Sequence, residues 1–107
     1  MKYCALVWKR LPANAMAIFP FLIFKHPALK RDHIIINHEK IHFVQQIELL
    51  IFPFYLLYIL NYLLNLLRFK NHQQAYLNIC FEKEAYANDH DLKYLSGRRL
   101  FSWIRYL

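Results

Sequence analysis

The amino-acid sequence predicts an α+β domain that is mainly α-helical and begins with a short β-hairpin. The chain of 107 residues suits one domain with one core, so we expect a single domain over residues 1–107. Two short runs rich in aromatic and aliphatic residues come first. From about residue 33, apolar side chains recur in steps of three and four, which is typical of helices. Strands followed by helices define the α+β class.

The hairpin is expected near the N-terminus. The segments "KYCALVW" (2–8) and "MAIFPFLIF" (16–24) have the composition of strands, and "KRLPANA" between them has that of a turn. Pro20 interrupts the second run and has no backbone N–H to donate. The second segment is therefore expected to be an edge strand or to carry a bulge.

After a polar loop at residues 25–32, the rest of the chain is expected to be helical. Asp32 can cap a first helix over residues 33–52, and Pro53 is expected to kink or end it. Gly97, the only glycine, is expected to form the C-terminal cap of an amphipathic helix. The further segments are expected as helices at 54–70, 81–95 and 98–107, and as a connection or helical turn at 71–78.

Composition and charge restrict the partners of the protein. With 58% hydrophobic residues, the chain has more apolar side chains than a small soluble core hides, so some should face a partner or a lipid surface. The net charge of +7 favours anionic partners. Because basic residues cluster beside apolar runs, phospholipid head groups fit this pattern better than nucleic acid does.

The two cysteines and the N-terminal run indicate the cellular compartment. Cys4 and Cys80 are expected to be free, buried thiols, which is compatible with a reducing cytoplasm. The apolar run at residues 3–8 is short and basic residues follow it, so no cleaved signal peptide is predicted. We expect a protein of the cytoplasm or of the cytoplasmic membrane.

Residues 47–67, "IELLIFPFYLLYILNYLLNLL", form an apolar run long enough to cross a bilayer. Glu48, Pro53, Asn61 and Asn65 within this run argue against a span. Three interpretations stay open: a core helix, a helix in the head-group layer, or one membrane span. Tyrosines in the run and nearby basic residues suit the head-group layer.

The segment "NHEKIHFVQQ" contains an HExxH motif. On a helix, His38 and His42 lie on one face, one turn apart, so both imidazoles can reach the same cation. Glu39 points about a quarter-turn away and can reach a water beside the metal. This is the division of roles in a zinc hydrolase, where the metal lowers the pKa of the water and the glutamate takes its proton.

A catalytic zinc ion needs a third protein ligand. The extension with glycine and a third histidine that follows the motif in metzincins is absent here. The segment "FEKEAYAND" offers a ligand instead, because Glu82, Ala85, Tyr86 and Asp89 share one helical face. Ala85 is small enough to let the two helices approach closely. Glu84 points away from that face.

HExxH followed roughly forty residues later by ExxA resembles the gluzincin clan of zinc metallopeptidases, and residues 34–106 are similar to a small group of bacterial HExxH proteins. The resemblance implies a minimal zincin-like fold with one Zn²⁺ held by His38, His42 and Glu82, and Glu39 as general base. Tyr86 stands where many gluzincins have an acidic residue. Asp89, one turn later, could then supply the carboxylate that orients a ligand.

Other residues are candidates for binding the reacting group. Tyr86 or Tyr76 could donate a hydrogen bond to a tetrahedral oxyanion, and His90 or His72 could do so as imidazolium. For each of these side chains, packing or surface exposure is the competing interpretation. The run at residues 16–24 could pair with an extended peptide substrate, or it could be plain core.

The sequence therefore predicts zinc-dependent hydrolysis of a peptide bond in a peptide or protein substrate, by a water activated between zinc and Glu39. One alternative is a non-catalytic protein that zinc only stabilises. Another is a metal-free basic protein associated with a membrane. Other divalent ions would accept the same ligands, and the sequence predicts neither an oligomeric state nor a nucleic-acid partner.

Overall fold

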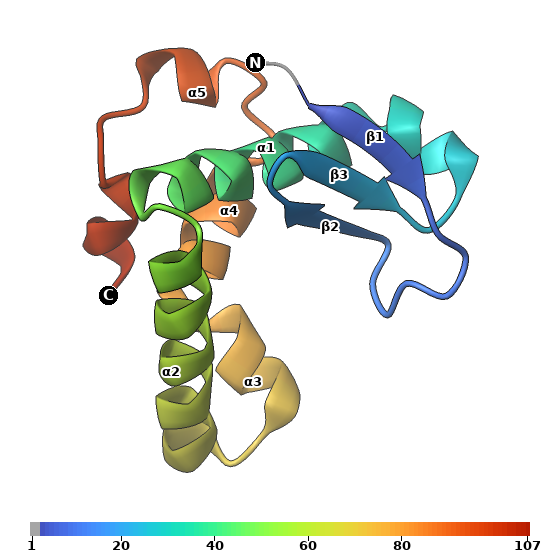
Figure 1. Ribbon diagram of the computed structural model, residues 1–107. Coiled ribbons are helices and arrows are strands. Elements are labelled where there is room, and N and C mark those ends of the chain that lie inside the picture. The colour runs from blue at the N-terminus through green and yellow to red at the C-terminus, as the bar shows by residue number, and fades with distance from the viewer. Residues whose placement is uncertain (1–2) are drawn as a thin grey trace.

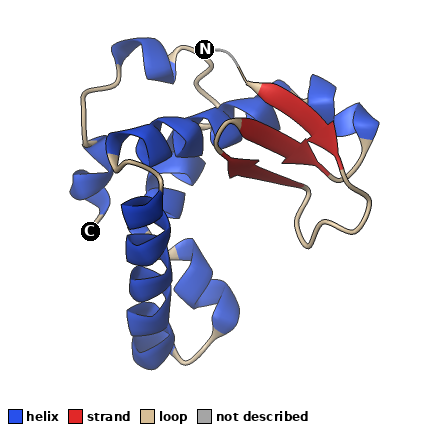
Figure 2. Ribbon diagram, in the orientation of Figure 1, coloured by secondary structure: helices blue, strands red, loops and turns tan. Residues whose placement is uncertain are grey.

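A small sheet formed by the N-terminal quarter of the chain packs against a set of helices formed by the rest (Figures 1 and 2). The computed structural model describes residues 3–107. Lys2, placed by the sequence in the first strand, lies outside the described residues. The mainly helical α+β class predicted from the sequence is confirmed.

The sheet has three strands in the order β1-β3-β2, where the sequence predicts only two. β1 is Cys4–Val7, β2 is Ala15–Ile18 and β3 is Phe21–Phe24. β3 is central, parallel to β1 and antiparallel to β2. The hairpin therefore forms within residues 16–24, between β2 and β3, and not between the runs 2–8 and 16–24. Phe19 and Pro20 form its turn. At that position Pro20, which has no backbone N–H, interrupts no hydrogen bond between strands. The edge strand beside the helices is β2.

The helix with the HExxH motif, α1, spans His33–Glu48. Its predicted N-cap is confirmed, since the Asp32 side chain accepts from the backbone N–H groups of Ile34 and Ile35. α1 ends four residues earlier than predicted. Pro53 does not end it but lies in the first turn of α2, Phe52–Phe69, where a missing N–H is tolerated.

The C-terminal third of the chain is divided into shorter helices than predicted. Residues 81–95 form α4, Cys80–Asn88, and the short α5, Tyr94–Gly97, instead of one helix. The amide of Asn37 on α1 donates to the carbonyls of Asp89 and Asp91, which are then not free to continue the helix. Gly97 is the last residue of α5 and has no positive φ, so it is not a left-handed cap.

The other connecting segments are short helices. Residues 71–78 contain α3, His72–Leu77, which the Asn71 side chain caps. The 25–32 loop contains a 3₁₀ helix, η1, Pro27–Arg31, and the predicted C-terminal helix is only a 3₁₀ turn, η2, Ser102–Tyr106. Both cysteines are free, as predicted, but Cys4 is exposed, because both faces of β1 are open, and only Cys80 is buried.

α1 lies between two apolar clusters. On one side, Phe43 of α1 packs with Leu22 and Phe24 of the sheet. On the other side of the fold, Phe54 of α2 and Phe81 of α4 pack with the C-terminal turn. α2 adds Phe54 and three half-buried tyrosines to the second cluster, but only Phe54 and Asn65 of its 18 residues are buried and most of the helix is exposed. The interpretation of residues 47–67 as a core helix is therefore wrong.

A buried ion-pair cluster joins the end of α1 to α4. The Arg98 guanidinium donates to both carboxylate oxygens of Glu48 and of Glu84, and the Tyr94 hydroxyl also donates to Glu84. The Arg98, Glu48 and Glu84 side chains are at most 4% exposed. Such a cluster is stable only while it is complete, because each charge left alone in the interior is very unfavourable.

Replacing Arg98 should therefore destabilise the fold strongly. Arg98→Ala leaves two buried carboxylates unpaired, and we expect the free energy of unfolding to fall by about 3–5 kcal/mol in a urea titration. Arg99→Ala is the matched control, because Arg99 is exposed and its loss should change stability by less than about 0.5 kcal/mol. Equal small effects of both substitutions would contradict a structural role for the cluster.

Candidate metal centre

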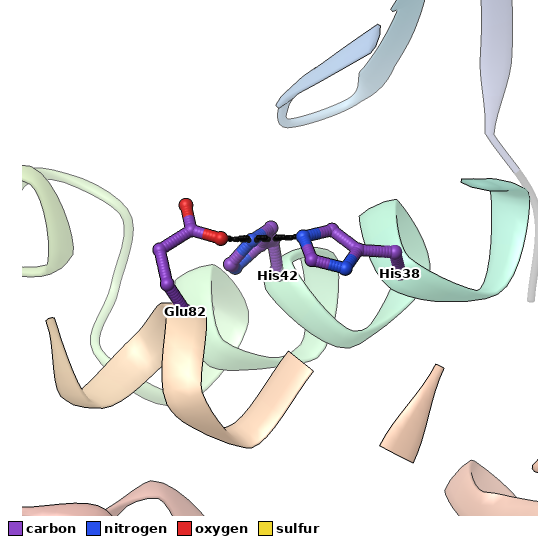
Figure 3. A group of neighbouring side chains, drawn as sticks. All are labelled: His38, His42 and Glu82. Carbon is purple, nitrogen blue, oxygen red and sulfur yellow. Dashed lines mark hydrogen bonds and ion pairs between the residues drawn. The ribbon is translucent and has the colours of Figure 1, made fainter. Parts of the chain in front are cut away.

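Three donor atoms meet between α1 and α4. His38 and His42 lie one turn apart on α1, so both rings leave the helix on the same face. Their Nε2 atoms are 3.2 Å apart. Oε1 of Glu82, on α4, lies 3.2 Å from Nε2 of His38 and 3.0 Å from Nε2 of His42 (Figure 3). All three residues are buried, and together they could hold a metal ion.

A hydrogen bond from His42 to Gln45 decides which nitrogen of His42 faces the cluster. Nδ1 of His42 lies 2.8 Å from Oε1 of Gln45. The amide must present its oxygen there, because its nitrogen donates to the carbonyl of Phe81 and to Glu84. Nδ1 of His42 is therefore the donor to Gln45, and Nε2 is the nitrogen that faces the cluster and would bind a metal in place of its proton.

Asp89 has the same relation to His38. Its Oδ2 lies 3.0 Å from Nδ1 of His38, and both side chains are buried. A carboxylate oxygen accepts this hydrogen bond, so Nδ1 of His38 donates it, and Nε2 is the nitrogen that faces the cluster. Asp89 follows the last residue of α4, which places it seven residues, or about two turns, beyond Glu82. The structure thus puts Asp89 where the sequence predicts an orienting carboxylate.

The second oxygen of Glu82 is held from α2. The Tyr58 hydroxyl donates to Oε2 at 2.6 Å, which leaves Oε1 to face the two histidines. Burial by itself would raise the pKa of Glu82, but the charge of His42 and the hydrogen bonds from His38, His42 and Tyr58 hold the pKa well below its usual range. Burial likewise opposes a charge on His42, yet Glu82 raises the pKa of His42 to about 9. Glu82 is an anionic ligand candidate.

Glu39 lies beside this cluster on the wall of a cavity of about 340 Å³. The wall also contains His38, His42 and Glu82, together with residues 15–17 of β2. Burial raises the pKa of Glu39, although the two histidines oppose the shift. A carboxylate with a raised pKa beside a metal-binding cluster is suited to accept a proton near neutral pH.

The structure separates the other candidate residues into two groups. Tyr76 and Tyr86 lie at the site: their hydroxyls are 3.1 Å apart, and the Tyr86 ring packs on His38 with ring centres 4.5 Å apart. His72 is turned away and lies 2.8 Å from the Tyr62 hydroxyl. His90 is exposed and contacts the outer oxygen of Asp89. Neither histidine lines the cavity.

Four residues that hold the site were not predicted from the sequence: Asn37, Gln45, Gln46 and Tyr58. Gln46 binds β2 to α1, since its amide donates to the carbonyl of Ala17 and accepts from the N–H of Phe19. Helical spacing could have found the glutamines, because Gln45 follows His42 by three residues and Gln46 follows Glu39 by seven. Tyr58 gave no such signal, because its partner is on another helix.

Comparison with protein-family models, with curated proteins and with solved structures gives no match for this chain. The resemblance to gluzincins therefore stays a prediction. The geometry of His38, His42, Glu82 and the adjoining cavity supports a function independently of any relative.

Removing the orienting carboxylate should weaken metal binding without unfolding the protein. With Zn²⁺ as the probe, Asp89→Ala is expected to lower the affinity 10- to 100-fold in a chelator competition, because His38 loses the partner that fixes its tautomer. Asp91→Ala removes the same charge from an exposed site two residues later and should leave the affinity unchanged. Circular dichroism checks that both variants are folded. Equal affinities would show that Asp89 has no orienting role.

Proposed function

We propose that this protein is a zinc-dependent peptidase of minimal size. The observation that carries the proposal is the convergence of two histidine nitrogens and one carboxylate oxygen on the wall of a cavity that also contains Glu39. Two histidines and a glutamate are a ligand set of catalytic zinc, which leaves one coordination position for water or substrate.

The distances between the donor atoms support zinc as the metal. Ligands of a tetrahedral zinc ion at 2.0–2.1 Å lie about 3.3–3.4 Å from one another. The three separations between the donor atoms of His38, His42 and Glu82 are 3.0–3.2 Å, so a small adjustment of the side chains makes room for the ion. The Nε2 atoms of both histidines already face the common point.

In this proposal, zinc supplies positive charge that polarises the substrate carbonyl and makes water more acidic. Glu39 accepts a proton from the attacking water as the oxygen of that water bonds to the carbonyl carbon. When the C–N bond breaks, Glu39 gives the proton to the leaving nitrogen. The raised pKa of Glu39 suits a group that must take up and release a proton in one cycle.

The edge of β2 is the proposed binding surface for the substrate backbone. The carbonyl of Asn14 accepts from the N–H of Lys25, the residue after β3, so by alternation Ala15 and Ala17 present their backbone groups away from the sheet. The carbonyl of Ala17 is already bonded to Gln46 and Tyr55. Ala15 lines the cavity and is the position where an extended peptide could add to the strand.

The variant Glu39→Gln tests the catalytic proposal. It keeps the size of the side chain and leaves the three metal ligands in place, so zinc content and fold should match the wild type. We expect hydrolysis of a peptide library to fall by about 10²- to 10⁴-fold, the range for loss of a general base.

The same assay distinguishes the alternatives. If zinc-loaded wild-type protein cleaves no member of the library, the peptidase proposal fails, and a zinc ion that only stabilises the fold becomes the better account. If Glu39→Gln remains as active as the wild type, the role of Glu39 as a base is wrong. Protein that binds no zinc at all would leave the metal-free membrane protein as the remaining hypothesis.

A further inference from the structure

The polar side chains of α2 that precede Arg68 all turn toward the protein. Within residues 52–67, each of them forms a hydrogen bond to another element: Tyr55 to β2, Tyr58 to α4, Asn61 to the N–H that begins α4, Tyr62 to His72, and Asn65 to the carbonyl of Ala75. All five are buried or half-buried. These residues therefore leave no polar group on the opposite side of the helix.

That opposite side, which we call the outer face of α2, is entirely apolar and exposed. It consists of Phe52, Pro53, Leu56, Leu57, Ile59, Leu60, Leu63, Leu64 and Leu67. Exposure is high along the whole length, from 84% at Phe52 through 69% at Leu56 to 77% at Leu67. Such a stripe, on a helix about 27 Å long, is much more apolar than the surface of a soluble monomer.

The exposed charge of the protein is more strongly positive than the net charge of the sequence suggests. Five of the seven acidic residues are in the metal site or the Arg98 cluster, so only Asp32 and Asp91 are exposed. The exposed basic residues of the described chain are Lys9, Arg10, Lys30, Arg31, Arg68, Lys70, Lys93, Arg99 and Arg105. An exposed apolar face on a protein with this surface charge complements a membrane of anionic phospholipids.

The packing of α3 decides how α2 meets such a membrane. α2 is the one helix in the described part of the chain that is long and apolar enough to span a bilayer. However, α3 packs along its inner side (Figure 1). This places the exposed His72, Gln73 and Gln74 of α3 on that side of α2. The tyrosines of the metal-site cavity lie on the inner side as well. A span would place these polar groups at the depth of the hydrocarbon, where unpaired polar groups are very unfavourable.

We propose that α2 lies flat in the head-group layer of an anionic phospholipid membrane, with its outer face inserted and its inner face toward the protein. The cavity wall formed by Phe54, Tyr55 and Tyr58 is then about one helix diameter from the lipid. Arg68 in the last turn of α2 and Lys70 directly after it would then lie beside the head groups.

Binding to vesicles of phosphatidylglycerol and phosphatidylcholine tests this orientation in the full chain. The double variant Leu60→Asp/Leu64→Asp changes two adjacent positions of the outer face, and we expect its affinity for phosphatidylglycerol vesicles to fall by about 100-fold or more. The control Leu6→Asp/Leu92→Asp changes two exposed leucines on β1 and after α4 and alters the net charge equally. Both double variants add two negative charges, which weaken binding to anionic vesicles equally. Apart from that effect, the affinity of the control should stay within a few-fold of the wild type.

The depth of spin labels separates a flat helix from a span. Labels at Leu56→Cys, Leu60→Cys, Leu63→Cys and Leu67→Cys, each in a Cys4→Ser background, should all lie at one shallow depth of about 5–10 Å. Depth that increases to the middle of α2 and then decreases would overturn the proposal in favour of a span. Two further results would also overturn it: no binding of wild type to either vesicle, or a dimer in solution that Leu60→Asp/Leu64→Asp dissociates.

Discussion

The contact between Glu82 of α4 and the two histidines of α1 determines the arrangement of most of the molecule. A buried carboxylate and two buried imidazoles are stable only if their polar atoms are paired. Each remaining polar atom of this group is therefore held by a further side chain: Tyr58 of α2 donates to the second oxygen of Glu82, Gln45 of α1 accepts from His42, and Asp89 at the end of α4 accepts from His38. The hydrogen bonds of this one polar cluster therefore fix α1, α2 and α4 relative to one another.

The polar interior continues beyond the metal centre. Gln45 links His42 to Glu84, which is paired with Arg98, and Arg98 in turn holds Glu48 at the end of α1. Buried polar groups of this kind tolerate little displacement, because an unpaired member is unfavourable in a low-dielectric interior. The continuous network gives a small protein with a modest apolar core a rigid set of ligands, which a metal site requires.

Features that depend on local spacing could be predicted from the sequence, whereas features that depend on distant partners could not. The cap at Asp32 and the shared face of His38 and His42 follow from helical geometry. The break after α4 could not be predicted, since it depends on Asn37, some fifty residues earlier in the chain. The three-stranded sheet requires a long-range parallel pairing. In α2, asparagines that argue against a membrane in the sequence turn inward in the fold and leave an apolar outer face.

The most direct test of the central claim is the metal content of protein purified without added zinc. Mass spectrometry of the elements should find about one zinc ion per chain in the wild type, because the three ligands have the donor set of a single site. His42→Ala removes one ligand and the proton donor to Gln45, so its zinc content should fall close to zero. Near-zero zinc in both proteins, or equal zinc in both, would contradict a metal centre at His38, His42 and Glu82.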